Sequence, residues 1–494
     1  MKKLKILSLL GAILLSSIVF AQNLTNATLI GTETITTPHG NIELEHNYPT
    51  SESSIMLFDM MDVQRASQAY MWAVPMVGFR CWKNEQAKSF DANKFGDFVV
   101  FNSLKEKRGI VTGNLTTPYI ISFLNLEKAP IVIDYPAGQT IGGVLDLWQR
   151  PVASFGMAGD DKGKGGKYII VGPLDDIAKY SDAEGTVIQS PSNNIFLGLR
   201  IINTDPKFAA EFEKSLKVAR YGEKLVNPRF IKGLDREWSS TPPRGLAYWK
   251  MLNEIINEEP VREVDKIMMA MLAPLGIEKG KPFSPDKRQT KILKEGATLG
   301  ELFSRNIQTN PRFARPYWKG TSWYKSFDFE TSQENDTMLQ LDERTTWFYE
   351  AVTSSEGMVN PKVGMGQVYM TAKRDNNGNL LRADKTYVLH VPSNVPAKQF
   401  WSLTLYSENT RRPYDNGGKE ISSISLDSRM KQLKVNSDGS VDIYIGSKAP
   451  KGHESNFLKT VGEDGWFTYF RLYAPTEPFF DKSFSLPDFK IIKI

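Results

Sequence analysis

Cysteine is almost absent from this sequence. Cys81 is the single cysteine among 494 residues, so the chain forms no intramolecular disulfide and its folded state depends on the burial of apolar side chains. The composition suits this, because 41% of the residues are hydrophobic and they include 27 Phe and 10 Trp. Cys81 lies between Phe79 and Trp82, which predicts a buried, inert thiol, since a nucleophilic thiolate needs a nearby histidine or a helix N-terminus.

Histidine is also scarce, which narrows the possible chemistry. None of the four histidines forms the helical pair with an adjacent glutamate that a zinc protease needs. The chain also lacks the Gly-x-Ser-x-Gly motif of α/β-hydrolases and the glycine patterns of nucleotide-binding loops. The segment 375–379 is similar to a calcium loop, but the position of its glycine favours a hairpin turn. We therefore expect no metal ion and no cofactor.

Long hydrophobic runs are missing after the beginning of the chain. Three lysines among the first five residues precede an uncharged apolar stretch over residues 6–20, and a small residue, Ala21, follows. This pattern predicts a secretory signal peptide over residues 1–21, because about 15 apolar residues are too few to span a bilayer comfortably. Cleavage after Ala21 lowers the net charge from +5 to +2, so we expect no nucleic-acid partner. The mature chain should be soluble and exported, periplasmic or secreted, with no membrane span.

Changes in hydrophobic pattern divide the remaining chain into three parts. Residues 22–205 are expected to form a β-rich domain with one early helix over about 52–73, which Pro75 ends. Residues 206–355 have mainly helical periodicity, and residues 356–494 return to short strands rich in β-branched and aromatic residues. We predict an α+β, multi-domain protein in which two β-sandwich (jelly-roll-like) regions are joined by a mainly helical middle region.

The first candidate ligand site is a predicted loop that contains Asp146, Trp148 and Arg150. An acid, an aromatic ring and a base close together are typical of carbohydrate-binding sites, because the ring stacks on the sugar and the charged groups bind its hydroxyls. A buried structural ion pair would use the same residue types. Both interpretations stay open at this point.

The second candidate is the glycine- and lysine-rich run over residues 156–167. Backbone N–H groups together with Lys164 and Lys167 could donate hydrogen bonds to an anion or a glycan. The run leads into a predicted strand, whereas a phosphate-binding loop leads into a helix N-terminus. A tight turn that needs glycine, with solvated lysines, is the competing interpretation.

Several separated motifs resemble those of a known bacterial family. The motifs in the N-terminal part are Pro38-His39-Gly40, Pro49, Arg65-Ala66, Tyr70, Trp72-Ala73, Pro75, Pro130-Ile131-Val132-Ile133 and the run 160–168. Those in the C-terminal part are the runs 400–406 and 436–446, Asn456 and Arg471-Leu472-Tyr473-Ala474-Pro475. The first set resembles the domain of unknown function 1254, and the second resembles its usual partner, the domain of unknown function 1214. The family usually has Trp-Leu-Pro after the asparagine, whereas Phe457-Leu458-Lys459 follow here, so a pocket shaped by this loop would differ.

The resemblance implies a fold more than a function. Members of this family are bacterial, often exported and oligomeric, with two β-sandwich regions joined by a helical part, and the resemblance implies no catalytic residue. We expect a homo-oligomer that binds or processes a small polar or carbohydrate-like ligand, at a site between the N-terminal β domain and the rest. One alternative is a hydrolase with paired carboxylates such as Asp146 and Asp160. Another is a structural or assembly protein without enzymatic activity.

Overall fold

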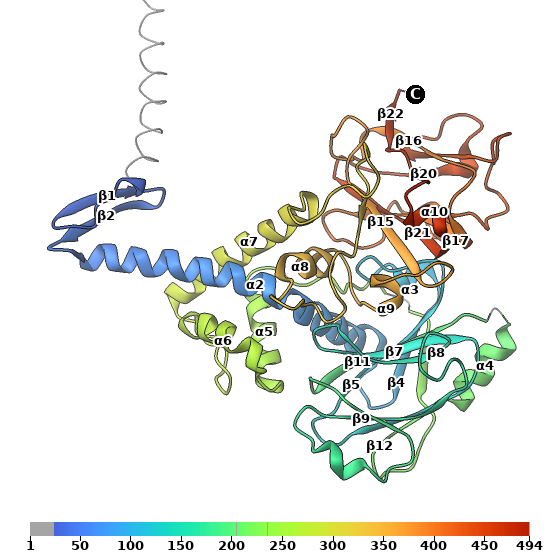
Figure 1. Ribbon diagram of the computed structural model, residues 1–494, viewed down its shortest axis with the longest axis horizontal. Helices are drawn as coiled ribbons and strands as arrows, with labels where there is room; N and C mark the ends of the chain where they lie inside the picture. The colour runs from blue at the N-terminus through green and yellow to red at the C-terminus, as the bar shows by residue number, and fades with distance from the viewer. Residues whose placement is uncertain (1–23, 204, 235, 494) are drawn as a thin grey trace, which may run out of the picture.

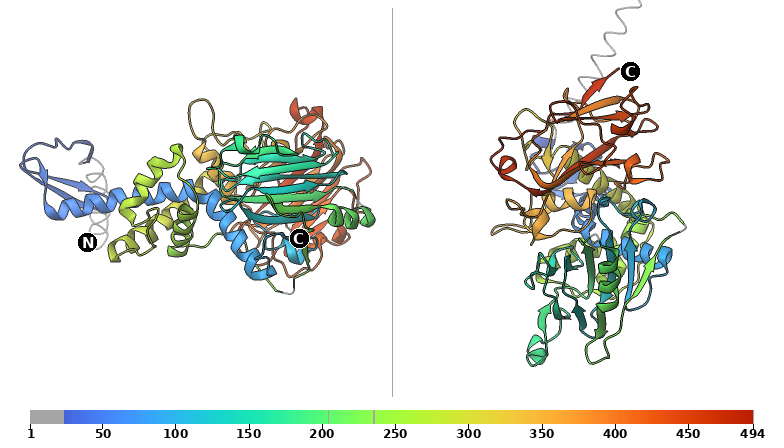
Figure 2. Two further views of the ribbon diagram at one scale, coloured as in Figure 1. Left: turned by 90° about the horizontal axis from the view of Figure 1, so that it is seen from below. Right: turned by 90° about the vertical axis from the view of Figure 1, so that its right-hand side faces the viewer.

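The computed structural model describes residues 24–203, 205–234 and 236–493, so the signal peptide expected over residues 1–21 lies outside the described residues. Strands β1 (Glu33–Thr37), β2 (Gly40–Glu45) and β3 (Tyr48–Pro49) form a small antiparallel sheet that precedes the long helix α2 (Ser51–Phe90). Figure 1 and Figure 2 show this sheet and the first part of α2 as an arm that projects from the molecule. The second half of α2 is buried in the body.

Helix α2 is longer than the sequence pattern predicts. The expected end at Pro75 is wrong, because the helix continues through this proline. Pro75 has no N–H group to donate to the carbonyl of Met71. The side-chain hydroxyl of Thr345, which donates to the Leu341 carbonyl at 2.6 Å, shares its proton with the Met71 carbonyl at 3.2 Å. The next carbonyl, that of Trp72, accepts a hydrogen bond from Arg344 Nη2 at 2.7 Å. Partners from a distant helix therefore compensate for the proline, and no local pattern shows them.

Two sheets in the N-terminal region share a buried core. The six-stranded sheet has the order β13-β4-β5-β11-β7-β8, and the four-stranded sheet has the order β10-β9-β6-β12. Ile120 of the first sheet and Ile133 and Ile170 of the second belong to one buried cluster. The other face of the six-stranded sheet packs on α2, where Phe196 stacks on Phe79 with ring centroids 5.0 Å apart. The bounds are β4 (Asp97–Phe101), α3 (Leu104–Lys107), β5 (Tyr119–Asn125), β6 (Ile131–Tyr135), β7 (Thr140–Asp146), β8 (Pro151–Gly156), β9 (Gly166–Val171), β10 (Thr186–Gln189), β11 (Asn194–Ile201), α4 (Pro206–Ser215), β12 (Lys217–Arg220) and β13 (Arg229–Lys232).

Helices of the middle region pack around α2 (Figure 1). They are α5 (Leu246–Glu258), α6 (Lys266–Leu272), α7 (Lys287–Thr309) and α8 (Leu341–Glu350), and the short α9 (Glu356–Val359) follows. Helices α2 and α7 approach closely because Gly296 and Gly300 of α7 face Ala66 and Tyr70 of α2. A Cβ atom at Gly296 would lie 2.2 Å from that of Ala66, so any larger residue would push the two helices apart.

Two further sheets form the C-terminal region, with strand orders β14-β15-β21-β17-β18 and β20-β19-β16-β22. Leu403 and Phe470 of the first sheet share a buried cluster with Leu389 and Ile443 of the second. The opposite face of the five-stranded sheet is rich in tyrosine and faces α8 and the N-terminal region. The bounds are β14 (Tyr324–Lys325), β15 (Gln367–Ala372), β16 (Thr386–Val391), β17 (Ala397–Ser407), β18 (Ser425–Asp427), β19 (Val441–Gly446), β20 (Phe457–Lys459), β21 (Trp466–Pro475), α10 (Glu477–Phe480) and β22 (Lys490–Ile492).

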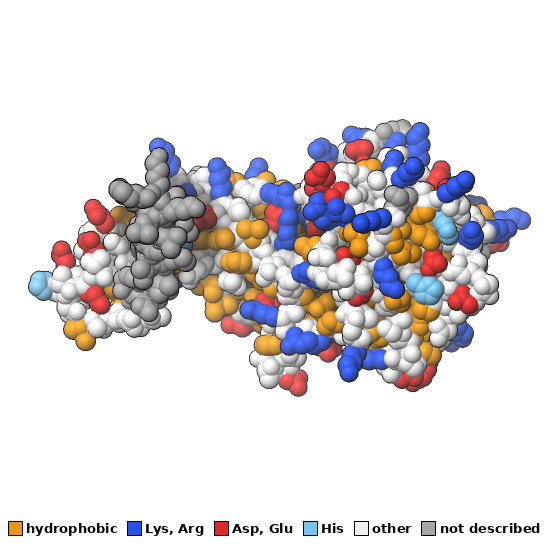
Figure 3. Space-filling model, turned by 90° about the horizontal axis from the view of Figure 1, so that it is seen from above, with side chains coloured by type: hydrophobic (Ala, Val, Ile, Leu, Met, Phe, Trp, Pro, Cys, Tyr) orange, Lys and Arg blue, Asp and Glu red, His pale blue; other side chains and the backbone are white. Residues whose placement is uncertain are grey.

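The prediction of a mixed α+β, multi-sheet protein is confirmed. The described residues form nine α-helices and several sheets, none of which closes into a barrel. Three strand pairs are parallel, namely β9 with β10, β4 with β13 and β19 with β20. Within the described part of the chain, no helix combines the length and apolarity needed to cross a bilayer. On the face seen from above in Figure 3, acidic and basic side chains are interspersed, with hydrophobic side chains between them.

Candidate functional site

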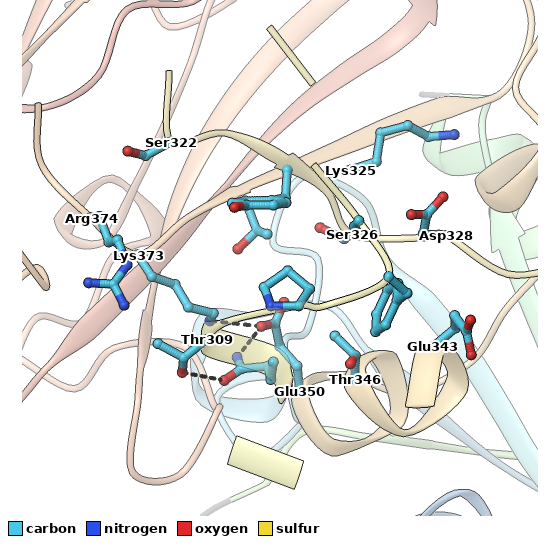
Figure 4. Close-up of a pocket in the computed structure, with 16 residues that line it drawn as sticks. Thr309, Ser322, Lys325, Ser326, Asp328, Glu343, Thr346, Glu350, Lys373 and Arg374 are labelled. Atoms are coloured by element: carbon cyan, nitrogen blue, oxygen red, sulfur yellow. Dashed lines mark hydrogen bonds and ion pairs between the residues drawn. The ribbon is translucent and has the colours of Figure 1, made fainter. Parts of the chain in front are cut away.

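A pocket lies where the end of α7, helix α8, the edge strand β14 and its neighbour β15 meet (Figure 4). The space between its walls measures about 590 Å³, and this figure includes the open mouth. Gln308, Ser326, Glu350, Thr371 and Lys373 are among the residues that line it. We refer to it as the Glu350 pocket.

Glu350 is a buried carboxylate in a position that needs compensation. It is the last residue of α8 and only 3% exposed, and the partial negative charge at a helix C-terminus disfavours a carboxylate there. Lys373 Nζ lies 2.8 Å from Glu350 Oε2, Gln308 Nε2 donates to the same oxygen, and the Tyr469 hydroxyl donates to Oε1. Burial and then the charge of Glu350 raise the pKa of Tyr469 well above its usual value, so this phenol remains a donor.

Three polar atoms of the pocket are buried but have no hydrogen-bond partner among the described residues: Ser326 Oγ, Thr371 Oγ1 and Lys373 Nζ. Lys373 is ion-paired with Glu350 and, at 3.6 Å, with Glu408, but neither contact has hydrogen-bond geometry. Buried polar atoms in native proteins are almost always paired, because an unpaired one costs free energy. A ligand with hydroxyl groups would supply the missing partners.

The arrangement is better suited to binding than to proton transfer. Glu350 is held by two hydrogen-bond donors and an ion pair, so its oxygens are fixed acceptors, while the hydroxyls and the ammonium group offer donors. Lys325, Arg374, Asp328 and Glu343 also line the pocket, as Figure 4 shows. Because these four side chains carry both signs of charge, a neutral ligand with several hydroxyl groups fits the pocket best.

The structure places the sequence-predicted Trp148 beside a second pocket, of about 390 Å³ including its open mouth. We refer to it as the Trp148 pocket. The guanidinium carbon of Arg262 lies 4.1 Å from the centre of the Trp148 ring. Arg262 in turn forms two hydrogen bonds with Asp265, at 2.6 and 3.0 Å, and Trp72 Nε1 donates to the same carboxylate at 3.2 Å. The charges and the indole N–H of this cluster are therefore paired within the protein.

Asp146 and Arg150 form a buried ion pair next to Trp148. Asp146 is fully buried. Its Oδ2 accepts a hydrogen bond from Arg150 Nε at 2.8 Å and lies 2.7 Å from Arg150 Nη2, while its Oδ1 accepts a hydrogen bond from the Arg150 backbone N–H. The pair therefore closes the turn between β7 and β8. This geometry is that of a buried structural ion pair, one of the two interpretations that the sequence left open. Neither residue lines the Trp148 pocket or the Glu350 pocket.

Lys164 lies in the connection between β8 and β9, and Lys167 is the second residue of β9. Lys164 is exposed, and Lys167 Nζ lies 2.5 Å from a carboxylate oxygen of Glu184. Neither lysine lines either of the two pockets, and the fold does not bring them to Trp148. Their role in binding stays a prediction.

Glu350, Lys373, Ser326 and Thr371 were not among the candidates from sequence. The segment that contains Glu350 has no clear period, and its neighbours Trp347 and Phe348 suggest only a buried element. One sequence signal for this site exists: in β15 and just after it, Tyr369, Thr371 and Lys373 alternate with apolar residues and therefore share one face of a strand. The pairing of that face with α7 and α8 could not be read from spacing.

Cys81 is buried, as predicted, and its Sγ–H donates to the carbonyl of Thr241 at 3.2 Å. Burial, and then the charge of Glu85, raise the pKa of this thiol to about 12, so it stays protonated and unreactive. In the described ranges, no three His, Cys, Asp or Glu side chains are grouped so that they could hold a metal ion.

The structure is that of a mixed α+β protein with several sheets and a pocket beside its C-terminal five-stranded sheet. The family Protein of unknown function (DUF1254) matches residues 95–220, and Protein of unknown function (DUF1214) matches residues 366–477. The chain therefore carries a DUF1254 domain followed by a DUF1214 domain, as the sequence motifs predict. Lys373 belongs to the second domain, whereas Glu350 lies in the segment between the two.

One solved structure supports the fold, and only the fold. The chain is similar to the crystal structure of the VPA0106 protein from Vibrio parahaemolyticus, with 17% identity, a TM-score of 0.52 and coverage of 87% of this chain and 100% of that one. A putative uncharacterized protein from Burkholderia cenocepacia matches with 11% identity and a TM-score of 0.39, over 90% of this chain and 97% of that one. The search of curated proteins gave no significant match.

Proposed function

We propose that this protein binds a small, neutral, hydroxyl-rich molecule such as a monosaccharide in the Glu350 pocket. The observation that carries the proposal is the set of three buried polar atoms without hydrogen-bond partners among the described residues, on Ser326, Thr371 and the ion-paired Lys373, around the fixed carboxylate of Glu350. A sugar carries donors and acceptors on the same hydroxyl groups, so it can accept from Lys373 and donate to Glu350 at once. Phe313 and Tyr324, which also line the pocket, offer apolar surface to the sugar ring.

The compartment and the finer architecture belong to the same proposal. The lysines, apolar run and small residue at the start of the chain support export, so the ligand would be met in the periplasm or outside the cell. The shared cores of each pair of sheets support two β-sandwiches joined by the helices around α2. A binding protein needs no catalytic residue, and this agrees with a pocket whose carboxylate is already held by donors.

The test is to remove the unpartnered hydroxyls one at a time. Ser326→Ala and Thr371→Val should weaken the binding of glucose or galactose about three- to tenfold, because each loses one hydrogen bond to the ligand. The free energy of unfolding should stay the same or rise slightly, since a buried hydroxyl without a partner contributes nothing to the folded protein. Binding is measured by isothermal titration calorimetry and stability by urea denaturation.

Ser402→Ala is a matched control for this experiment. Ser402 is fully buried and its hydroxyl also lacks a partner among the described residues, but it does not line the pocket. The control should show the same unchanged or increased stability with unchanged sugar affinity. The proposal fails if neither glucose nor galactose binds, or if Ser326→Ala and Ser402→Ala affect binding equally.

The paired-carboxylate hydrolase gains no support from the placement of its residues. Asp146 is fully buried beside Arg150 at one end of β8, and Asp160 is exposed beyond the other end of this six-residue strand. A strand rises about 3.3 Å per residue, so the two positions face different parts of the molecule. We therefore place the binding function ahead of it.

A further inference from the structure

Three basic side chains contact the loop after α3, or a residue that is hydrogen-bonded to that loop, at the junction between the two domains. They are Lys107 at the end of α3, Arg200 on β11 and Arg471 on β21. Lys107 and Arg471 are each 1% exposed, and Arg200 is half-buried. Helix α3 and the loop after it lie between the N-terminal and C-terminal sheets (Figure 1), and several hydrogen bonds join this loop to the C-terminal region, among them those from Asn114 to Tyr473 and from Tyr406 to Gly113. The cluster, which we call the junction cluster, therefore exists only when both domains are present.

The junction cluster has no counter-ion. Within the described ranges, none of its three side chains lies at ion-pair distance from a carboxylate. The carboxylate of Glu106, next to Lys107 in the chain, accepts hydrogen bonds from the backbone N–H groups of Asn102 and Ser103 and so caps α3. The free energy cost of a buried charge is high unless an opposite charge or hydrogen bonds compensate for it.

The hydrogen bonds that the cluster does make leave several donors free. Arg471 donates to the Tyr406 hydroxyl at 2.8 Å and more distantly to Thr404 and Thr112, while its Nε has no partner. Arg200 Nε and Nη2 are buried without a partner. Lys107 Nζ donates only to the carbonyl of Leu115, at 3.1 Å.

Aromatic rings surround these cations in place of carboxylates. The guanidinium carbon of Arg471 lies 5.0 Å from the ring centres of both Tyr369 and Tyr469, and that of Arg200 lies 4.6 Å from the ring centre of Tyr119. Such contacts attract a cation but do not neutralise it. Burial raises the pKa of Tyr369, and Arg471 and Arg200 both oppose this rise, so the two guanidinium groups act on one phenol.

The pKa of Lys107 is affected by the positive charge of its neighbours in the junction cluster. Burial, and then the charge of Arg200, lower the pKa of its ammonium group to about 7, although Glu106 acts in the opposite direction. An anion between these groups would favour the charged lysine and supply acceptors for the free guanidinium donors. Guanidinium groups match the planar, two-oxygen geometry of carboxylates and phosphates.

We propose that Lys107, Arg200 and Arg471 form a binding site for the oxyanion group of a small molecule, a carboxylate or a phosphate, at the junction of the two domains. Arg200, which is half-exposed, meets the ligand from the solvent side, and Arg471 binds it at the buried end. Two residues of the site lie in the DUF1254 range and one lies in the DUF1214 range. Both domains are therefore needed to form the site. It shares no residue with the lining of the Glu350 pocket, so it does not depend on the proposed sugar binding.

The test uses inorganic phosphate and acetate as probes, with sodium chloride at equal ionic strength as the reference. A ligand that binds the folded state raises the melting temperature in proportion to its occupancy, so the shift reports affinity. Phosphate, acetate or both should raise it more than chloride does, and the better probe identifies the oxyanion class. A shift no larger than that with chloride for both probes would overturn the proposal.

Arg200→Gln is the decisive variant, because the side chain of Arg200 makes no hydrogen bond with the described residues and its replacement should not unfold the chain. It should weaken the binding of the better probe about tenfold or more, and Arg200→Lys, which keeps the charge without the forked donors, should weaken it less. Arg220→Gln is the control: Arg220 is also half-buried over a ring, that of Phe95 at 4.9 Å, and also has a donor without a partner, but it lies on β12. Equal effects of Arg200→Gln and Arg220→Gln would refute the site.

Lys107 supplies an independent readout. At pH 8 the lysine is mostly neutral, since its pKa is about 7, and a bound anion should return a proton to it. Calorimetric titration of the better probe in two buffers of different ionisation enthalpy should therefore show proton uptake. Lys107→Met should abolish this uptake, and a binding reaction that takes up no proton in the unchanged protein would place the anion elsewhere.

Discussion

The Trp148 pocket and the Glu350 pocket differ in how their polar groups are paired. Beside Trp148, Arg262 is bound to Asp265, Trp72 donates to the same carboxylate, and Asp146 is bound to Arg150. In the Glu350 pocket, two hydroxyl groups and an ammonium group are buried without hydrogen-bond partners among the described residues. An acid, a base and an aromatic ring together therefore do not identify a ligand site. Donors and acceptors that the protein itself leaves unused are the better indicator.

This difference has a physical basis. Polar groups that are paired inside the protein stabilise the fold, and a ligand would have to break those bonds to use them. Unpaired buried groups cost stability in the free protein, and this cost is recovered when a ligand binds. Substitutions in the Trp148 region should therefore lower stability, whereas the hydroxyl substitutions in the Glu350 pocket should lower affinity.

Asp146→Ala should have the largest effect on stability. It leaves the guanidinium group of Arg150 without its carboxylate and removes the acceptor for the Arg150 backbone N–H, so the free energy of unfolding should fall by about 3 kcal/mol. Urea denaturation measures the loss. The affinity for sugars in the Glu350 pocket should not change.

Asp160→Ala is the control, because this carboxylate is exposed near the other end of β8. It should change the free energy of unfolding by less than about 0.5 kcal/mol. If Asp146→Ala instead retained its stability and lost ligand binding, the pair with Arg150 would be functional and the comparison between the two pockets would be wrong.

Local patterns were sufficient to predict much of the fold. Strands β4, β5, β6, β9 and β11 lie where runs of β-branched and aromatic residues predict them, and α5 and α7 follow the helical periodicity. The predicted end of α2 at Pro75 was wrong. The Met71 carbonyl, which Pro75 leaves without its N–H donor, is in contact with the hydroxyl of Thr345, a residue remote in the sequence. Secondary-structure propensity depends on residues that are close in the sequence, so it cannot reveal partners from distant segments.

The candidate site was harder to predict for the same reason. Trp148 does line a pocket, but the donors around Glu350 come from α7, from β21 and from the residue after β15. Pairings between segments so far apart depend on how the sheets and helices pack. Asp146 and Arg150, four residues apart, could be recognised as a possible ion pair, but the sequence does not show that the pair is buried and already satisfied.

The smallest expected effect, and the finest test of pairing near Trp148, concerns the neighbouring residues Glu258 and Glu259. Burial raises the pKa of Glu259, which lines the Trp148 pocket, above its ordinary 4.5, although Asn193 and Asn194 donate hydrogen bonds to it. Burial also acts on Glu258, but the hydrogen bond and charge of Arg80 lower its pKa overall. The two carboxylates should therefore affect stability in opposite directions as the pH changes.

A raised carboxyl pKa means that the folded state holds its proton more tightly, so Glu259 lowers stability as the pH rises above about 4.5. Relative to the unchanged protein, Glu259→Gln should become more stable over that range, apart from a constant offset for the hydrogen bond it loses. A lowered pKa has the opposite effect. The stabilisation by Glu258 is present above pH 4.5 and is lost as the pH falls below this value. Glu258→Gln should therefore be most destabilising at neutral pH. Urea denaturation of both variants between about pH 3 and 8 measures the two slopes. Slopes of the same sign would show that burial alone governs both carboxylates, and that the bond between Arg80 and Glu258 does not compensate for it.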